Sequence, residues 1–531
     1  MLDVAIVGGG ICGLALARSL AAKGVSYALF EARDRLGGRV LTVENPTSSL
    51  RLDLGPTWFW PQTQGAITRL VGELGLEPFD QHDPGTALLM TDPEKAPAVQ
   101  SAPGLHGGAR RLKGGMAALV AALAADLDPQ TLHFGHVLRA ARDCGEAVEL
   151  CFETGEGEVK IVARQVALAV PPRLLDRDVA FAPTLPDFVS VAMRDTPTWM
   201  AASAKAVIGL ADPPIWRAFG HSGNAFVVHD QAVLGEIFDA CGAGAESGAL
   251  GGFFALPPDT RDAFRSGLPM LAQSQFAQLF GPSLDAGELH LQDWASEPFT
   301  CTPADRAAGG AHPDYGARAF SQPLWAGKLF FGSSETAREG GGYVEGAINA
   351  AARIARHILP QQETSMTIED IAGSPAERNA RCLELFHEWV ASRRAPAFAA
   401  YRQRLNFALS HGEREQLTQR AMLGAMEAIF ADALSMIDEL PFDHAGVAVE
   451  RGRSDLTPKV QAAFDGFIQA LLDAIIDFNR TSCALSNFPD EHKPAKDYVS
   501  ATLRDIGAAW REFSLEANSR LIAKQCAPVE A

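Results

Sequence analysis

The chain has 531 residues, of which 47% are hydrophobic and 21% are charged, a composition typical of globular proteins and unlike that of disordered chains. At roughly 150 residues per domain, this length predicts about three or four domains' worth of chain. The formal net charge of −18 opposes binding to phosphate backbones or anionic lipid, so we expect a small-molecule partner rather than nucleic acid or a membrane.

The N-terminal segment predicts a dinucleotide site. Residues 3–7 (DVAIV) have the pattern of a buried parallel strand, residues 8–13 (GGGICG) form a GxGxxG turn, and residues 14–22 have a helical pattern. Gly8, Gly10 and Gly13 would allow a tight turn, approach of backbone N–H groups to a pyrophosphate, and close helix packing. A second strand over residues 26–30 ends in Glu31, whose carboxylate can accept both ribose hydroxyls.

The residues after Glu31 favour FAD over NAD. Residues 32–39 (ARDRLGGR) continue the acid-terminated strand into a second glycine turn. There Gly38 would bring further backbone, and Arg33 and Arg39 would bring positive charge, to the diphosphate. We therefore expect FAD as the cofactor.

The two ends of the chain differ in their patterns. Residues 1 to about 360 alternate β-rich runs with helical patterns, whereas residues 374–531 contain almost only helical patterns. Ser374, Pro375 and Glu377 together form an N-cap, a first-turn proline and a capping box, so we expect a helix to begin there. Apolar stripes such as residues 460–478 predict an all-α helical bundle beside an α/β (α+β) region.

The eight cysteines contain no CxxC pair and no spacing typical of a zinc site, which favours a reducing compartment. Residue 1 leads directly into a strand without the pattern of a secretory signal, so we expect a cytoplasmic protein. The bundle has one ExxH pair, Glu384 and His387, and one copy cannot make a di-iron site. We therefore predict no metal.

The motifs of residues 1–360 together resemble the flavin-dependent amine oxidase family, which includes the monoamine and polyamine oxidases. The matching segments are residues 53–58 (DLGPTW), 113–116 (KGGM), 169–173 (AVPPR), 329–337 (LFFGSSETA) and 342–347 (GYVEGA). The resemblance implies a Rossmann-like FAD-binding domain and an interleaved mixed-sheet substrate domain, with the helical bundle as an additional domain. The implied ranges are 1–77, 106–182 and 310–360 for the FAD-binding domain, 78–105 and 183–309 for the substrate domain, and 374–531 for the helical domain.

The resemblance also implies roles for single residues. Lys205 would hold a water beside flavin N5, and Tyr343 would form one wall of an aromatic cage around a neutral amine. A helix beginning near Tyr343 would place its positive end where a reduced flavin accumulates negative charge. Further residues implied to contact FAD are Gly55, Val137, Val344, Ala347, and Glu335, which would bind the ribitol.

The sequence departs from the family's pattern at two places, the second wall of the aromatic cage and the segment that covers the substrate site. In the monoamine oxidases a second tyrosine follows a Trp-containing strand, but the same count from Trp294 leads here to Ala304, and Phe299 is the aromatic residue near by. Trp58 and Trp60 are further candidates for this wall, and we take Trp58 as the third catalytic candidate. Pro303 stands where mammalian monoamine oxidases carry their flavin-linking cysteine, with Cys301 near by, so we predict non-covalent FAD. Residues 78–110 are too few for the helical insertion that roofs many relatives. The C-terminal helices are expected to supply a roof or a homo-oligomer contact.

The resulting functional hypothesis is amine oxidation. The C–H bond next to nitrogen would lose a hydride equivalent to flavin N5, the imine would hydrolyse, and O2 would be reduced to H2O2. One alternative is an FAD-dependent desaturase of the protoporphyrinogen-oxidase type, against which Lys205 argues. Another is a flavin-bound scaffold whose helical tail binds a partner. Because the sequence does not place Arg173 or Arg217, it only mildly favours amines over amino acids.

Overall fold

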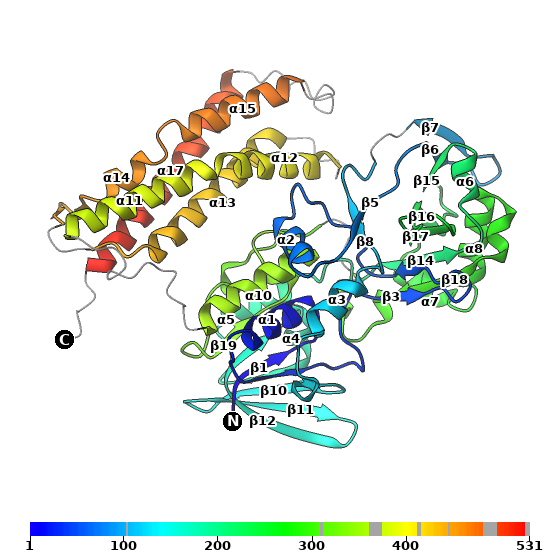
Figure 1. The fold of residues 1–531 in the computed structure, drawn as a ribbon, viewed down its shortest axis with the longest axis horizontal. Coiled ribbons are helices and arrows are strands. Elements are labelled where there is room, and N and C mark those ends of the chain that lie inside the picture. The colour runs from blue at the N-terminus through cyan, green and yellow to red at the C-terminus, as the bar shows by residue number, and fades with distance from the viewer. Residues whose placement is uncertain are drawn as a thin grey trace. The chain divides into compact units, whose positions relative to one another are not determined.

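The computed structural model describes residues 1–101, 105–307, 312–359, 374–410, 416–443, 447–481 and 496–525. The chain divides into two compact units, residues 1–360 and residues 361–531 (Figure 1). Within the described parts, no helix is both long and apolar enough to cross a membrane.

The first unit contains an eight-stranded sheet in the order β13-β10-β11-β12-β1-β2-β9, with β19 also paired to β12. Its centre is parallel, because β1 pairs in parallel with both β12 and β2, whereas β10, β11 and β12 form an antiparallel meander. The strands are β1 Leu2–Val7, β2 Tyr27–Phe30, β9 Leu132–His133, β10 Val137–Asp143, β11 Val148–Thr154, β12 Gly157–Leu168, β13 Ala180–Ala182 and β19 Leu329–Phe331.

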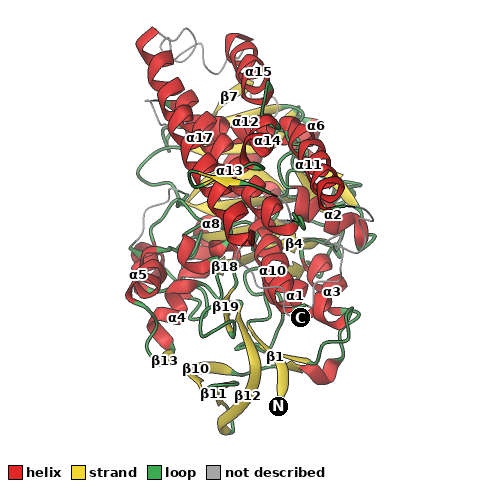
Figure 2. Cartoon of the chain, turned by 90° about the vertical axis from the view of Figure 1, so that its left-hand side faces the viewer, coloured by secondary structure: helices red, strands yellow, loops and turns green. Residues whose placement is uncertain are grey.

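Three helices cover the β1 face of this sheet. Helices α1 (Ile11–Ala21), α3 (Ala117–Ala124) and α10 (Val344–Ile358) lie side by side next to β1 (Figure 2). Val4 and Ile6 of β1 share one buried core with side chains of all three helices. This core fixes the start of α1 at the carboxyl end of β1, where α/β proteins place their ligands.

A second, seven-stranded sheet has the order β18-β14-β17-β16-β15-β6-β7. Helix α8 (Leu268–Phe280) contributes Ala272 and Phe276 to the core on this sheet, which also includes Trp216 of α6 (Ile215–Ala218). The strands are β6 Thr86–Met90, β7 Ala98–Ser101, β14 Ala204–Gly209, β15 His221–Val227, β16 Leu234–Asp239, β17 Ala249–Phe254 and β18 Glu288–Asp293.

Short elements connect the two sheets. Two antiparallel pairs form, β3 (Thr42–Glu44) with β4 (Arg51–Asp53) and β5 (Pro78–Asp80) with β8 (Arg110–Leu112). Described residues between β5 and β8 form strands and turns and no helix, in keeping with the short segment seen in the sequence. The remaining helices of this unit are α2 Gly65–Glu73, α4 Pro172–Asp178, α5 Asp187–Asp195, α6 Ile215–Ala218, α7 Pro258–Ala263 and α9 Pro303–Arg306. The assignment of the predicted ranges to an FAD-binding and a substrate domain stays a prediction.

The described part of the second unit consists of helices and one small hairpin. The capping box at Ser374 forms as the sequence predicted, and α11 begins at Pro375. The apolar stripe of residues 460–478 is buried but divided between two helices by a turn at Gly466, where φ is +72°. The elements are α11 Pro375–Ser392, α12 Arg394–Ser410, α13 Leu417–Glu439, β20 Val449–Glu450, β21 Arg453–Ser454, α14 Thr457–Ala462, α15 Phe467–Thr481 and α17 Lys496–Gln525. Its expected roles as a roof or a homo-oligomer contact stay predictions.

Candidate active site

A cavity of about 460 Å³ in the first unit brings together residues from distant parts of the chain. It is lined by the GxGxxG turn, the end of β2, the start of β14 and the first turn of α10. Most of the predicted site residues line it: Gly8, Gly10, Glu31, Arg33, Gly38, Arg39, Gly55, Trp58, Val137, Lys205, Tyr343, Val344 and Ala347. Gly13 and Glu335 are not among the lining residues.

The GxGxxG turn forms one wall of the cavity, and its backbone packs closely against helix α1. A Cβ on Gly13 would lie 1.9 Å from the carbonyl oxygen of Gly8, so this position needs glycine for helix packing rather than for ligand contact. A Cβ on Gly10 would meet nothing within 4 Å. Helix α1 begins after Gly10 with no side-chain cap, which leaves its first N–H groups available for an anion.

Glu31 holds this turn in place. Its Oε2 accepts a hydrogen bond from the Gly9 backbone N–H at 2.6 Å, and its Oε1 accepts one from the Arg33 N–H at 2.9 Å. The Arg33 guanidinium turns to Glu297, at 3.0 Å, and to the Thr300 hydroxyl, at 2.9 Å. The charge of Arg33 is therefore neutralised by the protein itself, and the ribose contact of Glu31 stays a prediction.

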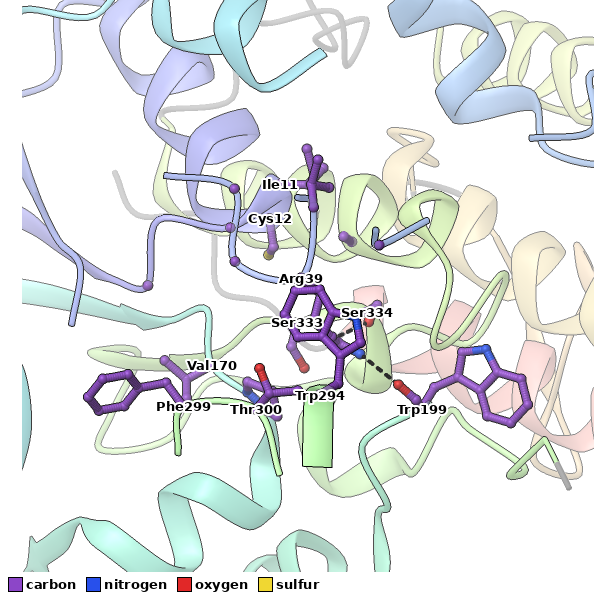
Figure 3. A pocket seen from close by; sticks show the side chains of 18 of the residues that line it. Ile11, Cys12, Arg39, Val170, Trp199, Trp294, Phe299, Thr300, Ser333 and Ser334 are labelled. Carbon is purple, nitrogen blue, oxygen red and sulfur yellow. Dashed lines mark hydrogen bonds between the residues drawn. The ribbon is translucent and has the colours of Figure 1, made fainter. Parts of the chain in front are cut away.

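Arg39 and Glu335 form a bidentate ion pair at the cavity. The two nitrogen–oxygen distances are 2.6 and 3.0 Å, and Arg39 also donates to the Ser334 hydroxyl and the Trp199 carbonyl (Figure 3). Burial opposes ionisation of Glu335, but the charge and hydrogen bond of Arg39, together with hydrogen bonds from the backbone and Ser334, hold the pKa of Glu335 below its ordinary value. Glu335 is fully buried, so the structure shows it positioning Arg39, while its predicted contact with ribitol stays a prediction.

The first turn of α10 opens into the cavity. Tyr343 occupies the N-cap position in an extended backbone conformation and provides no side-chain cap. Glu345 instead reaches across to α2, where its two carboxylate oxygens accept the backbone N–H groups of Ala66 and Ile67 at 2.9 and 2.8 Å. Sequence reasoning missed this role of Glu345, although the residue lies inside the GYVEGA motif.

Two aromatic side chains, His312 and Trp199, lie near Tyr343. The Tyr343 ring stacks on His312 with centroids 5.1 Å apart, and His312 lies 4.5 Å from the ring of Trp199. Burial raises the pKa of Tyr343, so its phenol stays neutral. Trp199 lines the cavity, and neither Trp199 nor His312 was predicted from the sequence. The signal that could have found Trp199 is its position beside the segment that carries Lys205.

Trp58 and Trp60 line the same cavity from the segment after Gly55. The Trp58 indole N–H donates to Gln81 at 2.9 Å, and the Trp60 indole N–H donates to the His106 carbonyl at 3.2 Å. The rings of Trp58 and His106 lie 4.9 Å apart. Phe299, the other aromatic candidate, also lines the cavity, and the Arg33 guanidinium lies over its ring.

Lys205 lies in β14 with 2% of its surface exposed. Its Nζ donates to the Gly55 carbonyl at 3.1 Å and to the Thr57 hydroxyl. The rings of Phe238, Phe253 and Trp58 lie 5.0, 5.4 and 5.8 Å from this nitrogen. Burial lowers the pKa of Lys205 from 10.5 to about 7, so the amine is close to its titration midpoint near neutral pH.

Glu236, in β16, is a carboxylate in this cavity that sequence reasoning missed, as it missed Trp199. It is partly buried, and burial raises the pKa of its carboxyl group above the ordinary value. Its signal in the sequence was weak, because an acidic residue in a predicted strand is usually solvent-facing.

The two arginines that the sequence could not place are now located outside the cavity lining. Arg217 forms a bidentate pair with Asp239 at 2.8 and 2.9 Å, and Arg173 pairs with Asp305 at 2.8 Å. The cavity-lining Arg33 and Arg39 are paired with Glu297 and Glu335. Among the described lining residues, each arginine is thus already matched by a carboxylate of the protein.

These features fit a flavin dinucleotide. The uncapped N-termini of α1 and α10 both face the cavity, which suits a diphosphate at one and the electron-rich edge of a flavin ring at the other. The Ser333 hydroxyl lines the same space, is buried and has no hydrogen-bond partner among the residues that the structure describes. A bound ligand with polar atoms would satisfy it.

Comparison with known protein families shows which family the chain belongs to. The profile described as flavin containing amine oxidoreductase matches residues 94–359, and an NAD(P)-binding Rossmann-like profile matches residues 6–74. The chain belongs to the flavin-containing amine oxidoreductase family. It is therefore an amine oxidoreductase, with FAD as the cofactor that the dinucleotide-binding motif indicates.

Individual relatives of this amine oxidoreductase match between 14% and 67% of the chain. Putrescine oxidase from Kocuria rosea is 24% identical over 469 residues, covering 67% of this chain and 95% of the relative. The flavin-containing amine oxidase B of Canis lupus familiaris is 48% identical over 77 residues, 14% of each chain. The structure of putrescine oxidase bound to putrescine has a TM-score of 0.56 and 21% identity, covering 67% of this chain and 98% of that one. Cyclohexylamine oxidase from Brevibacterium oxydans gives a TM-score of 0.55 at 18% identity, and both likenesses concern the fold.

Proposed function

We propose that the protein oxidises an amine with FAD held non-covalently in this cavity and with O2 as the final acceptor. The observation that carries the proposal is the placement of buried Lys205 in the same cavity as the GxGxxG turn and the first turn of α10. FAD, when bound, accepts the hydride equivalent from the C–H bond next to nitrogen and passes the electrons to O2, which gives H2O2. The imine product then hydrolyses to a carbonyl compound.

The chain's own residues would bind the cofactor, orient the amine substrate and exclude bulk water. The N–H groups at the start of α1 would hold the diphosphate, and the positive end of α10 would stabilise negative charge on the flavin. Tyr343, Trp58 and Trp199 supply flat apolar surfaces that orient a neutral amine and keep bulk water away. Lys205 would hold a water molecule and assist the reaction with oxygen.

The charges of the cavity favour an amine without a carboxylate. A substrate carboxylate would need a free arginine, and the lining arginines are already paired within the protein. Glu236 offers the opposite charge in the same space. We propose that it attracts cationic substrates, with a diamine as the favoured class. The relative named putrescine oxidase, whose name is that of a diamine oxidase, supports this choice.

The two alternatives are less well supported. A desaturase of apolar ring systems gains nothing from a lysine and a carboxylate buried in its substrate space, because burying charged groups costs free energy. A flavin-bound scaffold would likewise have no use for them.

The test is reconstitution followed by a substrate panel. The purified protein is saturated with FAD, and H2O2 formation is measured with diamines of increasing length, primary and secondary monoamines, polyamines and amino acids. We expect peroxide with diamines, weaker turnover of monoamines and none with amino acids. Peroxide from amino acids alone would overturn the substrate proposal, and a lack of peroxide with every amine despite bound FAD would overturn the proposed oxidase.

A further inference from the structure

A short turn at residues 297–301 forms part of the cavity wall. The turn is closed by a hydrogen bond of 3.0 Å from the Thr300 backbone N–H to the Glu297 carbonyl. Phe299 and Thr300 line the cavity (Figure 3), and Thr300 is only 1% exposed. Pro298, at the tip, is exposed. The 297–301 turn therefore has the cavity on one side and solvent on the other.

The guanidinium of Arg33 holds this turn from within the cavity lining. Arg33 follows the end of β2 by three residues, and its Nε and Nη2 donate to Glu297 Oε2 at 3.3 and 3.0 Å. Nη2 also donates to the Thr300 hydroxyl at 2.9 Å, and the guanidinium carbon lies 5.5 Å from the centre of the Phe299 ring. The Arg33 and Glu297 side chains are 11% and 30% exposed, so water only partly weakens the pair. One guanidinium thus contacts three of the five residues of the turn.

A second arginine holds the same turn by its backbone. Arg177, in α4, donates to the carbonyls of Pro298 and Cys301 at 3.1 and 3.3 Å. Arg177 does not line the cavity, although Leu174 and Leu175 of the same helix do. The turn is therefore fixed to α4 on one side and to the segment after β2 on the other. Because Arg177 binds carbonyl groups, changes to the side chains of the turn would leave this attachment intact.

Arg33 keeps two donors that the turn does not use. An arginine has five N–H groups, and the contacts with Glu297 and Thr300 take three of them, on Nε and Nη2. Nη1 carries the other two, makes no hydrogen bond with any residue that the structure describes, and lies 4.0 Å from Glu31 Oε1. Because Arg33 lines the cavity, these N–H groups can donate to a ligand there. One side chain can thus hold the turn and a bound ligand together.

We propose that Glu297 is a positioning residue for the cofactor: acting through Arg33, it keeps the 297–301 turn closed against the cavity and so slows the release of FAD. Glu297 itself does not line the cavity. Since the turn separates the cavity from solvent, opening it would expose a ligand that no covalent bond retains. The inference rests on the FAD binding within the proposed function and is independent of the amine oxidation.

The test is the rate at which FAD leaves the protein. The FAD-saturated protein is freed of excess cofactor and diluted, and the change in flavin fluorescence follows the release. Glu297→Gln keeps the shape of the side chain and removes its charge, so we expect the dissociation rate constant to rise about 10-fold. An unchanged rate constant in this variant would overturn the proposal.

A double-variant cycle shows whether Glu297 acts through Arg33. Arg33→Met removes every guanidinium contact, so it should also speed release. Adding Glu297→Gln to Arg33→Met should then change the rate constant little further, because the partner of Glu297 is already gone. A second rise of about 10-fold in the double variant would show that Glu297 acts independently of Arg33, which would overturn the proposal.

Thr300 provides a second route to the same contact. Thr300→Val removes the hydroxyl that accepts from Arg33 and keeps the size of the side chain, so release should be about 3-fold faster. Thr300→Ser keeps the hydroxyl and should release FAD close to the wild-type rate. If Glu297→Gln does not fold, as judged by circular dichroism, this pair decides the matter, and equal rates in the two variants would overturn the proposal.

A matched control is an ion pair of similar burial elsewhere in the first unit. Lys328 and Asp143 pair at 3.1 Å with side chains 13% and 20% exposed, and neither residue lines the cavity. Asp143→Asn should leave the FAD dissociation rate unchanged. An increase equal to that of Glu297→Gln would mean that losing any half-buried ion pair is enough, which would contradict a specific role of the turn.

The proposed oxidase and this inference fail in distinguishable ways. Failure of the oxidase would appear as absent peroxide from a protein that holds FAD, with the variant dissociation rates still ordered as expected. Failure of the inference would appear as unchanged FAD release in Glu297→Gln with peroxide formation intact. A protein that takes up no FAD would overturn both.

Discussion

The two ends of the cavity differ in what lines them, because one is lined mostly by backbone and the other by side chains. The end at the GxGxxG turn is made mostly of backbone, with Gly8, Gly10 and the uncapped first turn of α1. The other end is made of side chains that come from separate strands, above all Lys205, Glu236 and Trp58. The first end is a local motif, whereas the second exists only when distant segments fold together. Substitutions at each end therefore test this difference.

The largest effect is expected at the backbone-built end. In Gly13→Ala the new Cβ would lie 1.9 Å from the Gly8 carbonyl, so α1 must move away from β1. We expect the free energy of unfolding of the first unit to fall by more than about 3 kcal/mol and FAD to be lost. Thermal unfolding of the apoprotein measures it. Gly10→Ala is the control, because its Cβ meets nothing within 4 Å; an equally stable Gly13→Ala apoprotein would contradict the packing argument.

At the side-chain end, Lys205→Met removes the amine but keeps a side chain of similar length. We expect the reaction of the reduced enzyme with O2 to slow about 100-fold, while reduction by the amine changes only a few-fold. Stopped-flow absorbance of the two half-reactions separates these rates. Lys328→Met is a matched control, since Lys328 pairs with Asp143 at 3.1 Å and does not line the cavity. Equal losses in both half-reactions would show that Lys205 has a general structural role.

A smaller and more selective effect is expected for Glu236→Gln. The change keeps the shape of the side chain and removes its charge, so KM for a diamine should rise roughly 10-fold or more. Turnover of a monoamine of similar length should change little and serves as the internal control. Steady-state peroxide assays measure both. A parallel loss for monoamine and diamine would show that Glu236 does not bind a second ammonium.

The smallest effect concerns stability and pH. Because the pKa of Lys205 is about 7 when folded and 10.5 when exposed, the unfolded chain binds more protons between these values. Stability must therefore rise with pH across this range. Relative to Lys205→Met, the wild-type apoprotein should gain at most about 3 kcal/mol between pH 7 and 9. Urea unfolding at several pH values measures this gain. If the difference in free energy of unfolding between the two proteins does not change with pH, the pKa of Lys205 is not lowered in the folded state.

The sequence predicted the backbone-built end well because its signals are local. The strand, glycine turn, helix and acid of residues 3–31 lie within one contiguous segment, and α10 begins where the GYVEGA motif indicated. The capping box at Ser374 was predicted for the same reason, since its donors and acceptors lie three residues apart.

The side-chain end could be predicted only in part. Lys205 was found through a family resemblance, because a lone lysine in an apolar strand has no local signature. Glu236 was missed, since nothing in residues 234–239 shows that this strand faces the same cavity as Lys205. Arg217 could not be assigned until the fold showed its pairing with Asp239 across 22 residues. Each case depends on contacts between distant segments.

The most direct measurement is the visible flavin spectrum of the FAD-saturated protein when a diamine is added without oxygen. The account predicts that the flavin band bleaches, that admitting air restores it, and that H2O2 appears in equal amount. A protein that takes up no FAD, or a flavin band that no amine bleaches, would contradict the central claim that this cavity unites a flavin with an amine substrate beside Lys205.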